Sequence, residues 1–356
     1  MPTLPSETTD ASSATTGPRR GYGITIPFDD LPLADHRDRL KECADLGYTD
    51  LWSSEANGTD AFTPIAMAAA WLAADHPTLR YGCAIVPAFT RGPALLAQSV
   101  AAIVEAIPTQ GSFAFGIGTS SDVIVERWNG IPFEEPYKRT RDMVRFLRQA
   151  LTGEKVDQPF DTITSAGFRL GRKPSVTAAT ANPPSILVAA LRPGMLRLAG
   201  KEGDGAIINW LGADDVKQVV PEVGNAGGNG TKEIVARLFV CPSEDVETVR
   251  TFGRMAIAAY LNVPVYAAFH EWLGRGAQLK PMWDAWKVGD RKAATAAIPD
   301  EVVDDLVIHG SPAQCREHIQ RYVDNGVTTP VLAVLPFGVD MSDAIRQLAP
   351  ASRITA

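Results

Sequence analysis

The sequence is poor in cysteine, charged residues and long apolar runs, features that identify several large classes of protein. It contains four cysteines in 356 residues and only 21% charged residues, and no uncharged apolar run approaches the roughly 20 residues that a membrane helix requires. The cysteines, at positions 43, 83, 241 and 315, form no Cys-x-x-Cys pair, and no histidine stands at zinc-finger spacing from them. A structural zinc site is therefore not expected, and the dispersed thiols fit a reducing compartment.

The charge balance also argues against one class of partner. Lys and Arg number 34 against 41 Asp and Glu, with a pI near 5.4, whereas a nucleic-acid-binding protein usually shows a basic face. A hydrophobic content of 45% excludes wholesale disorder. Residues 1–20 are rich in Thr, Ser and Ala without the apolar stretch of a signal peptide, so we predict a flexible tail there. We expect a cytoplasmic protein that binds neither nucleic acid nor membrane.

Motifs for nucleotide binding and nucleophilic catalysis are missing. There is no Gly-x-Ser-x-Gly elbow and no phosphate loop, and no Gly-x-Gly-x-x-Gly opens the first strand–helix unit. The stretch Gly116-Ile117-Gly118-Thr119 comes closest but lacks the third glycine, and it fits better as a strand end that lets backbone approach a flat ligand. The five histidines are scattered with no metal-ligand spacing, so no metal is expected.

From residue 21 onward, short β-branched runs alternate with amphipathic helical stretches. The predicted strands are residues 21–26, 49–53, 79–86, 112–117, 186–190, 205–209, 233–240 and 331–335. Eight strand–helix units imply a parallel sheet covered by helices and suit a (β/α)8 TIM barrel. A doubly wound sheet is the competing architecture.

Capping residues and glycines in the sequence predict where several helices begin or end. Ser311-Pro312-Ala313-Gln314 has the pattern of a capping box with proline in the first turn, and Gly47, Gly153 and Gly326 stand where helices should end. Two stretches, about 157–184 and 263–310, exceed what a barrel needs, and insertions in this fold usually decorate the C-terminal rim. The second holds three tryptophans, so it is either a substrate lid or a segment that its tryptophans pack onto the barrel.

Three strand ends carry the candidate site residues. Glu55 directly follows the second strand, where a carboxylate serves as acid or base if burial raises its pKa, or else caps the next loop. The turn from Ala189 to Gly194 ends a strand and starts a helix, and free amides at a helix N-terminus bind anions, with Arg192 able to add a charge-assisted contact. Small residues around Cys83 in the third strand mark a bulge or a close ligand approach.

Taken in order, a set of short motifs resembles the bacterial luciferase-like family, in particular its actinobacterial branch of coenzyme F420-dependent oxidoreductases. The matching stretches are Leu46-Gly47-Tyr48-Thr49-Asp50-Leu51-Trp52, Thr90-Arg91-Gly92-Pro93, Gly111 to Ser120, Arg139-Thr140-Arg141, Val188-Ala189-Ala190-Leu191-Arg192-Pro193, Gly203-Asp204-Gly205 and Gly310-Ser311-Pro312. They span about residues 21–340, so the resemblance covers nearly the whole chain and implies a single luciferase-like barrel domain over residues 21–356.

The resemblance implies a flavin or deazaflavin in a cleft at the C-terminal ends of the strands. In such proteins a bulge with a non-proline cis peptide on strand three supports the cofactor ring, which maps onto Cys83–Ala84. The implied cofactor-binding residues are Cys83 and Ala84 at this bulge, Gly118, Thr119 and Ser120 beside the ring or its tail, Ala189, Ala190, Leu191 and Arg192 near the phosphate, and Asn209 at the end of strand six. Homodimerisation is common in the family and is implied as well.

The sequence departs from the branch that oxidises glucose 6-phosphate. In that branch an Asp-His pair follows strand two and a glutamate follows a Gly-Thr-Gly turn, whereas here the positions read Glu55-Ala56 and Ser121. The missing histidine makes reduction of an activated C=C, C=N or C=O bond by F420 the more natural reaction, with the proton from Glu55 or from water. An FMN-dependent monooxygenase and a non-catalytic flavin-binding protein are the alternatives.

Overall fold

Eight parallel strands close into a barrel in the computed structural model, which describes residues 19–227 and 231–350. They are β1 (Gly23–Thr25), β2 (Asp50–Ser53), β3 (Arg80–Pro87), β4 (Ser112–Gly118), β5 (Ser185–Ala189), β6 (Gly205–Asn209), β7 (Glu233–Cys241) and β9 (Thr329–Val334). Each strand pairs with the next, β6 pairs with β7, and β9 lies between β7 and β1. The predicted TIM barrel is confirmed and the doubly wound sheet is excluded, because these eight strands form a closed ring. The predicted tail falls almost wholly on residues 1–18, outside the described residues.

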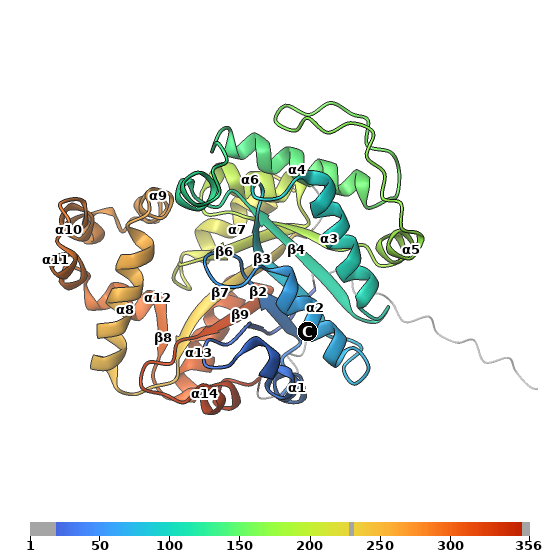
Figure 1. Cartoon of the computed structure of the whole chain (residues 1–356). Coiled ribbons are helices and arrows are strands. Elements are labelled where there is room, and N and C mark those ends of the chain that lie inside the picture. Colours follow the sequence, from blue (N-terminus) through green and yellow to red (C-terminus); the bar gives the residue numbers. More distant parts are fainter. Residues whose placement is uncertain (1–18, 228–230, 351–356) are drawn as a thin grey trace, which may run out of the picture.

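The barrel is wrapped by helices that alternate with these strands (Figure 1). They are α1 (Arg37–Asp45), α2 (Phe62–Leu72), α3 (Pro93–Ala106), α4 (Pro136–Ala150), α6 (Pro193–Glu202), α7 (Val216–Gly224), α13 (Pro312–Asp324) and α14 (Met341–Gln347). The short helices η1 (Leu33–Asp35) and η2 (Val123–Trp128) precede α1 and α4. No helix of the described residues is long and apolar enough to cross a membrane.

The helix ends follow the local signals. Ser311 caps α13 through a reciprocal pair of hydrogen bonds with Gln314, so the capping box is confirmed. Gly47, Gly153 and Gly326 adopt φ angles of +98°, +81° and +117° just beyond α1, α4 and α13, a conformation that glycine adopts at little cost.

The barrel interior is built in layers. At the N-terminal end the buried Arg80 guanidinium forms a two-pronged ion pair with Glu233 and lies 3.6 Å from Asp50. Above this floor lies an apolar layer composed of Trp52, Ala114, Leu187, Ile207, Val235 and Val331. The Trp52 ring fills the centre so tightly that a Cβ atom on Gly82 would meet it at 2.2 Å, so only glycine fits at that position of β3.

The second insertion is larger than predicted. Helices α8 (Val246–Leu261), α9 (Pro264–Trp272), α10 (Gly276–Lys287), α11 (Arg291–Ala296) and α12 (Asp300–Leu306), with strand β8 (Val307–His309), form a lobe at one side of the barrel (Figure 1). The buried side chains of α8 join a second core with α10, α11 and α12, whereas those of α13 join the main barrel core. The barrel helix between β7 and β9 is therefore α13, and the insertion starts directly after β7 rather than at residue 263.

The three tryptophans pack in two places: Trp272 lies against the main barrel core, and Trp283 and Trp286 lie against the lobe core. Trp283 donates its indole N–H to the carbonyl of Leu261 at 2.8 Å, and Trp272 stacks on Phe269. The Trp286 ring lies under the Arg291 guanidinium, 3.7 Å from ring centre to the guanidinium carbon. These contacts agree with the packing interpretation of the tryptophans.

The first insertion joins α4 to β5, so both of its ends lie at the N-terminal side of the barrel. It includes α5 (Lys173–Ala181) and one antiparallel bridge between Val156 and Phe168. Its middle reaches the first turn of α4, where Arg139 donates to the carbonyl of Thr162 at 2.7 Å. Only this middle part approaches the C-terminal rim, because a helix that follows a barrel strand begins at the rim.

Candidate active site

The mouth of the barrel, at the C-terminal ends of the strands, holds a small pocket. Its lining residues are Thr25, Trp52, Ser53, Ser54, Ala84, Ile207, Val235, Arg237 and Val331. Three of their polar atoms, Thr25 Oγ1, Trp52 Nε1 and Arg237 Nε, are buried without a hydrogen-bond partner among the described residues. Buried polar groups are rarely left unpaired, so three such atoms around one pocket indicate a place for a polar ligand.

Strand β3 is bulged where it borders this mouth. Cys83 pairs with Phe115 and Val86 with Ile117, so Ala84 and Ile85 together face one residue of β4. The peptide bond between Ala84 and Ile85 is cis. A bulge and a non-proline cis bond on strand three are thus confirmed, but the cis bond lies one residue later than predicted, because the extra residue of the bulge is inserted after Cys83.

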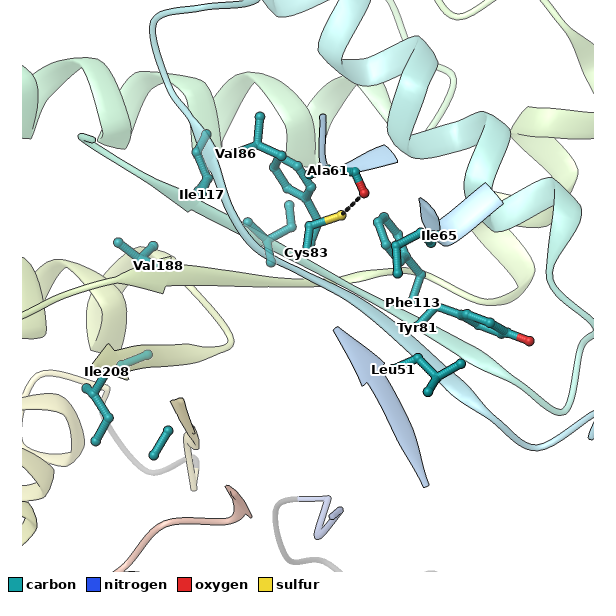
Figure 2. Packing of buried hydrophobic residues seen from close by; sticks show 14 of the residues in the cluster. Leu51, Ala61, Ile65, Tyr81, Cys83, Val86, Phe113, Ile117, Val188 and Ile208 are labelled. Carbon is teal, nitrogen blue, oxygen red and sulfur yellow. Dashed lines mark hydrogen bonds between the residues drawn. The ribbon is translucent and has the colours of Figure 1, made fainter. Parts of the chain in front are cut away.

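Cys83 and Ala84 consequently face different surroundings. Ala84 lines the pocket, whereas the Cys83 side chain is fully buried on the outside of the barrel, with Sγ 3.7 Å from the carbonyl oxygen of Ala61 (Figure 2). Burial raises the pKa of the Cys83 thiol to about 12. The sulfur is therefore inert, and Cys83 contributes backbone rather than side chain to this region.

The end of β4 packs closely against the bulge of β3. A Cβ atom on Gly116 would lie 2.2 Å from the Cys83 carbonyl oxygen, and one on Gly118 would lie 2.8 Å from Ala189 Cβ and 3.0 Å from Ile85 Cδ1. Glycine is required at both positions. Thr119 and Ser120 follow half-buried, and Ser120 has a φ of +60°, so the backbone turns sharply away from the strand.

The turn after β5 presents backbone donors. Ala190 is buried, Leu191 is half-buried, and Arg192 is exposed at the position preceding α6. Pro193 occupies the first turn of α6. The first α-helical hydrogen bond is donated by the backbone N–H of Leu196 to the Arg192 carbonyl at 3.0 Å. The amides of Gly194 and Met195 are therefore free to bind an anion, as expected at a helix N-terminus.

Glu55 is engaged in the loop after β2 and is not among the residues that line the pocket. Its carboxylate accepts from Arg91 Nη1 at 2.6 Å and from the backbone N–H of Ala61 at 3.1 Å. These contacts agree with the alternative role, a carboxylate that caps the following loop.

Strands β6 and β7 supply polar groups that the sequence analysis missed. Arg237 pairs in register with Asn209, and both point into the barrel at the level of the pocket. Asn209 Nδ2 lies 3.2 Å from the hydroxyl of Tyr266, a residue of α9, while Asn209 Oδ1 is buried without a partner among the described residues. Asn209 was predicted as a site residue; Arg237 and Tyr266 were not. The signal for Arg237 is its alternation with Val235 and Phe239 in a strand that is buried on both faces.

An aromatic wall borders these groups. Trp210 stacks on Phe239 with ring centres 3.9 Å apart, and Tyr260 lies 5.1 Å from Trp210 and edge-on to Tyr266. Tyr260 and Tyr266 come from α8 and α9, so the lobe completes one side of the mouth. The described residues contain no cluster of three or more His, Cys, Asp or Glu side chains able to hold a metal ion.

Together these features suit a flat heteroaromatic ligand with an anionic group. The glycines let β4 pack directly against the bulge, the unpartnered atoms of Thr25, Trp52 and Asn209 offer hydrogen bonds to the edge of a ring, and the start of α6 offers amides to an anion. Of the predicted positions, Ala84, Gly118, Ala189 and Asn209 lie around this mouth, whereas Glu55 and the Cys83 side chain do not line it.

Comparison with known proteins agrees with this geometry. The family described as luciferase-like monooxygenase matches residues 8–329. The 5,10-methylenetetrahydromethanopterin reductase of Methanolobus tindarius is 25% identical over 91% of this chain and 97% of its own length. A putative coenzyme F420-dependent oxidoreductase of Mycobacterium tuberculosis is 25% identical over 85% of this chain and 91% of its own. The structure of the coenzyme F420-dependent tetrahydromethanopterin reductase of Methanopyrus kandleri superimposes with a TM-score of 0.73 at 19% identity, covering 93% of this chain and 98% of that one.

Proposed function

Because the chain belongs to the luciferase-like monooxygenase family, we propose that it is an oxidoreductase that binds coenzyme F420 at the mouth of its barrel and transfers a hydride between this deazaflavin and a small organic substrate. The names of the two relatives support the reaction class and the coenzyme, since one is a reductase and the other is described as F420-dependent. The substrate class that fits best is an activated C=C, C=N or C=O bond.

One observation carries the proposal: the buried polar atoms without partners gather around the bulge and glycines of the mouth. Thr25 Oγ1, Trp52 Nε1 and Asn209 Oδ1 offer both donors and acceptors to the edge of a deazaflavin ring. Gly116 and Gly118 let β4 lie directly against the bulge. A ligand ring with polar edges would satisfy all of these groups at once.

When bound, F420 supplies or accepts the hydride. The chain's own residues would bind the coenzyme and orient its ring. The bulge at Ala84 and Ile85 would support the ring, and the amides of Gly194 and Met195, with Arg192 beside them, would hold the coenzyme phosphate. The apolar layer around Trp52 closes the barrel below the site and excludes water from that side.

The proton that accompanies hydride transfer has two candidate sources, Glu55 and water. Since Arg91 holds the Glu55 side chain in an ion pair and Glu55 does not line the pocket, we favour water.

Fluorescence titration of the purified protein with F420, and separately with FMN, tests the proposal. Low-micromolar binding of F420 alone supports hydride transfer and justifies a screen of enones and imines. A preference for FMN would favour an FMN-dependent monooxygenase, the activity for which the family is named. Tight binding of either without turnover by any acceptor would indicate a non-catalytic flavin-binding protein, and binding of neither would refute the proposal.

We also propose that the protein acts as a cytoplasmic homodimer. The four cysteines are free and buried, which suits a reducing compartment. Light scattering coupled to size-exclusion chromatography would give the mass of the particle, and a mass near 38 kDa, that of one chain, would refute the dimer.

A further inference from the structure

Arg237 in the barrel mouth lacks the partner that such a residue normally has. It is half-buried, its Nε has no hydrogen-bond partner, and its guanidinium forms no ion pair with any residue of 19–227 or 231–350. Every other buried or half-buried arginine in the described chain donates to a carboxylate or carbonyl oxygen; these are Arg39, Arg80, Arg91, Arg139, Arg141, Arg250, Arg254, Arg275 and Arg316. A guanidinium without an anion in a partly desolvated site is costly, so its retention requires an explanation.

The residues around Arg237 do not neutralise it. The pocket lining contains no carboxylate, and the cation lies over the Phe239 ring, 5.1 Å from its centre. The hydroxyl of Tyr266 accepts from Asn209 Nδ2, which leaves the Tyr266 O–H free to donate toward a ligand. Burial raises the pKa of Tyr266 to about 12, although the Arg237 charge opposes this shift, so the phenol stays protonated at neutral pH.

The rest of the surroundings are flat and apolar. Phe239 and Trp210 of the aromatic wall are buried against each other beside Arg237, and Tyr260, which is 39% exposed, is the ring of this wall that is open to a ligand. Arg237 is on β7, whereas the free amides at the start of α6 follow β5, with β6 between them. The two anion-binding features are therefore separate, and one coenzyme phosphate does not account for both.

We propose that Arg237, with the hydroxyl of Tyr266, binds the carboxylate of the substrate, and that the substrate is a small organic acid whose planar, conjugated body lies against the exposed Tyr260 ring of the aromatic wall. This inference rests on the proposed function and narrows its substrate class. A guanidinium recognises a carboxylate through charge-assisted hydrogen bonds, and an aromatic wall favours a flat π-system over a flexible aliphatic chain.

Calorimetric titration with two probes of the same shape tests the charge requirement. The probes are trans-cinnamate and its neutral amide, added to the full-length protein with and without saturating F420. Wild type should bind the carboxylate at least about tenfold more tightly than the amide, in line with a charge-assisted contact. Arg237→Gln should abolish this preference, and Tyr266→Phe should weaken cinnamate binding severalfold. Arg321→Gln, on the exposed outer face of α13, is the matched control and should leave the preference unchanged.

Two further measurements separate substrate binding from other roles of Arg237. Arg237→Gln should raise the melting temperature of the ligand-free protein by about 2 °C, because it removes a cation without a partner, whereas a structural arginine would lower the melting temperature when removed. The Kd for F420 should stay within about threefold of wild type, since we assign the guanidinium to the substrate.

Equal binding of the two probes by wild type, or binding of neither, would overturn the inference. So would a fall in melting temperature, or a loss of F420 affinity in Arg237→Gln as large as the loss of cinnamate affinity. Failure of wild type to bind F420 would instead refute the proposed function. The probe preference measured without F420 would still test the carboxylate-binding role of Arg237 independently of that result.

Discussion

A buried histidine makes the stability of this protein depend on pH in a way that can be calculated. His270, in α9, is fully buried, and neither ring nitrogen makes a hydrogen bond of normal geometry with the described residues. Burial lowers the pKa of His270 from 6.5 to about 3, the nearby Arg275 charge adds to the effect, and the Trp210 backbone partly opposes it. The folded protein therefore keeps this ring neutral at pH values where the unfolded chain protonates it.

The sign follows from proton linkage. Below pH 6.5 the unfolded chain binds a proton at this position and the folded protein does not, so the free energy of unfolding falls as the pH falls toward 3. A pH of 5.0 lies 1.5 units below the pKa of 6.5 that this histidine has in the unfolded chain. Each of these pH units changes the free energy of unfolding by about 1.36 kcal/mol. His270 alone should thus remove about 2 kcal/mol of stability at pH 5.0.

Urea unfolding of wild type and His270→Leu at pH 7.5 and 5.0 measures this difference. Titrations of all other groups contribute equally to both proteins, so wild type should lose about 2 kcal/mol more than the variant between the two pH values. Phe269→Leu, at the adjacent buried position, is the control: it changes packing without a titratable group and should lower stability by the same amount at both pH values. An equal pH dependence of wild type and His270→Leu would refute the reasoning.

Three other variants test the site and the barrel floor. Arg192→Ala should weaken F420 binding by about 1–3 kcal/mol in a fluorescence titration if the guanidinium pairs with the coenzyme phosphate; an unchanged Kd rejects that role. Glu55→Gln should change turnover by less than about threefold, because Glu55 does not line the pocket and water supplies the proton; a tenfold loss of turnover at unchanged F420 affinity would make Glu55 the acid. Glu233→Gln leaves the Arg80 guanidinium poorly paired in the core, so it should lower the free energy of unfolding measured in urea by about 3–5 kcal/mol. The Kd for F420 should not change. Full stability of the variant would show that the floor tolerates an incompletely paired cation.

The barrel strands and most helices could be predicted from the sequence because their signals are local. Capping residues such as Ser311 and helix-ending glycines act within one turn, and β-branched runs mark strands whatever their partners. The extent of the second insertion could not be predicted, because α8 is as amphipathic as a barrel helix and its pattern does not tell which core its apolar face joins. The core that α8 shares with α10, α11 and α12, and the close contact of Gly253 with Val303 in α12, show that α8 packs on the lobe.

The sequence could place residues at the mouth through backbone signals but not through side-chain direction. Gly118 and Ala189 lie beside each other at the mouth, as small residues at strand ends permit. The resemblance mapped the bulge onto Cys83–Ala84 but could not tell that the Cys83 side chain faces the helices outside the barrel. Arg237 escaped notice because an arginine in a strand is usually taken to face solvent, and only barrel closure turns it inward.

The layered barrel interior separates two charged regions that are otherwise close in sequence. Glu233 at the floor and Arg237 at the mouth are four residues apart on β7, and the tightly packed layer around Trp52 lies between them. Because that layer is apolar and leaves no room beside Gly82, no chain of hydrogen bonds connects the two ends. Evolution and protein engineering can therefore adjust thermostability at one end and ligand preference at the other as independent traits, which is a physical basis for the wide range of reactions found on one scaffold.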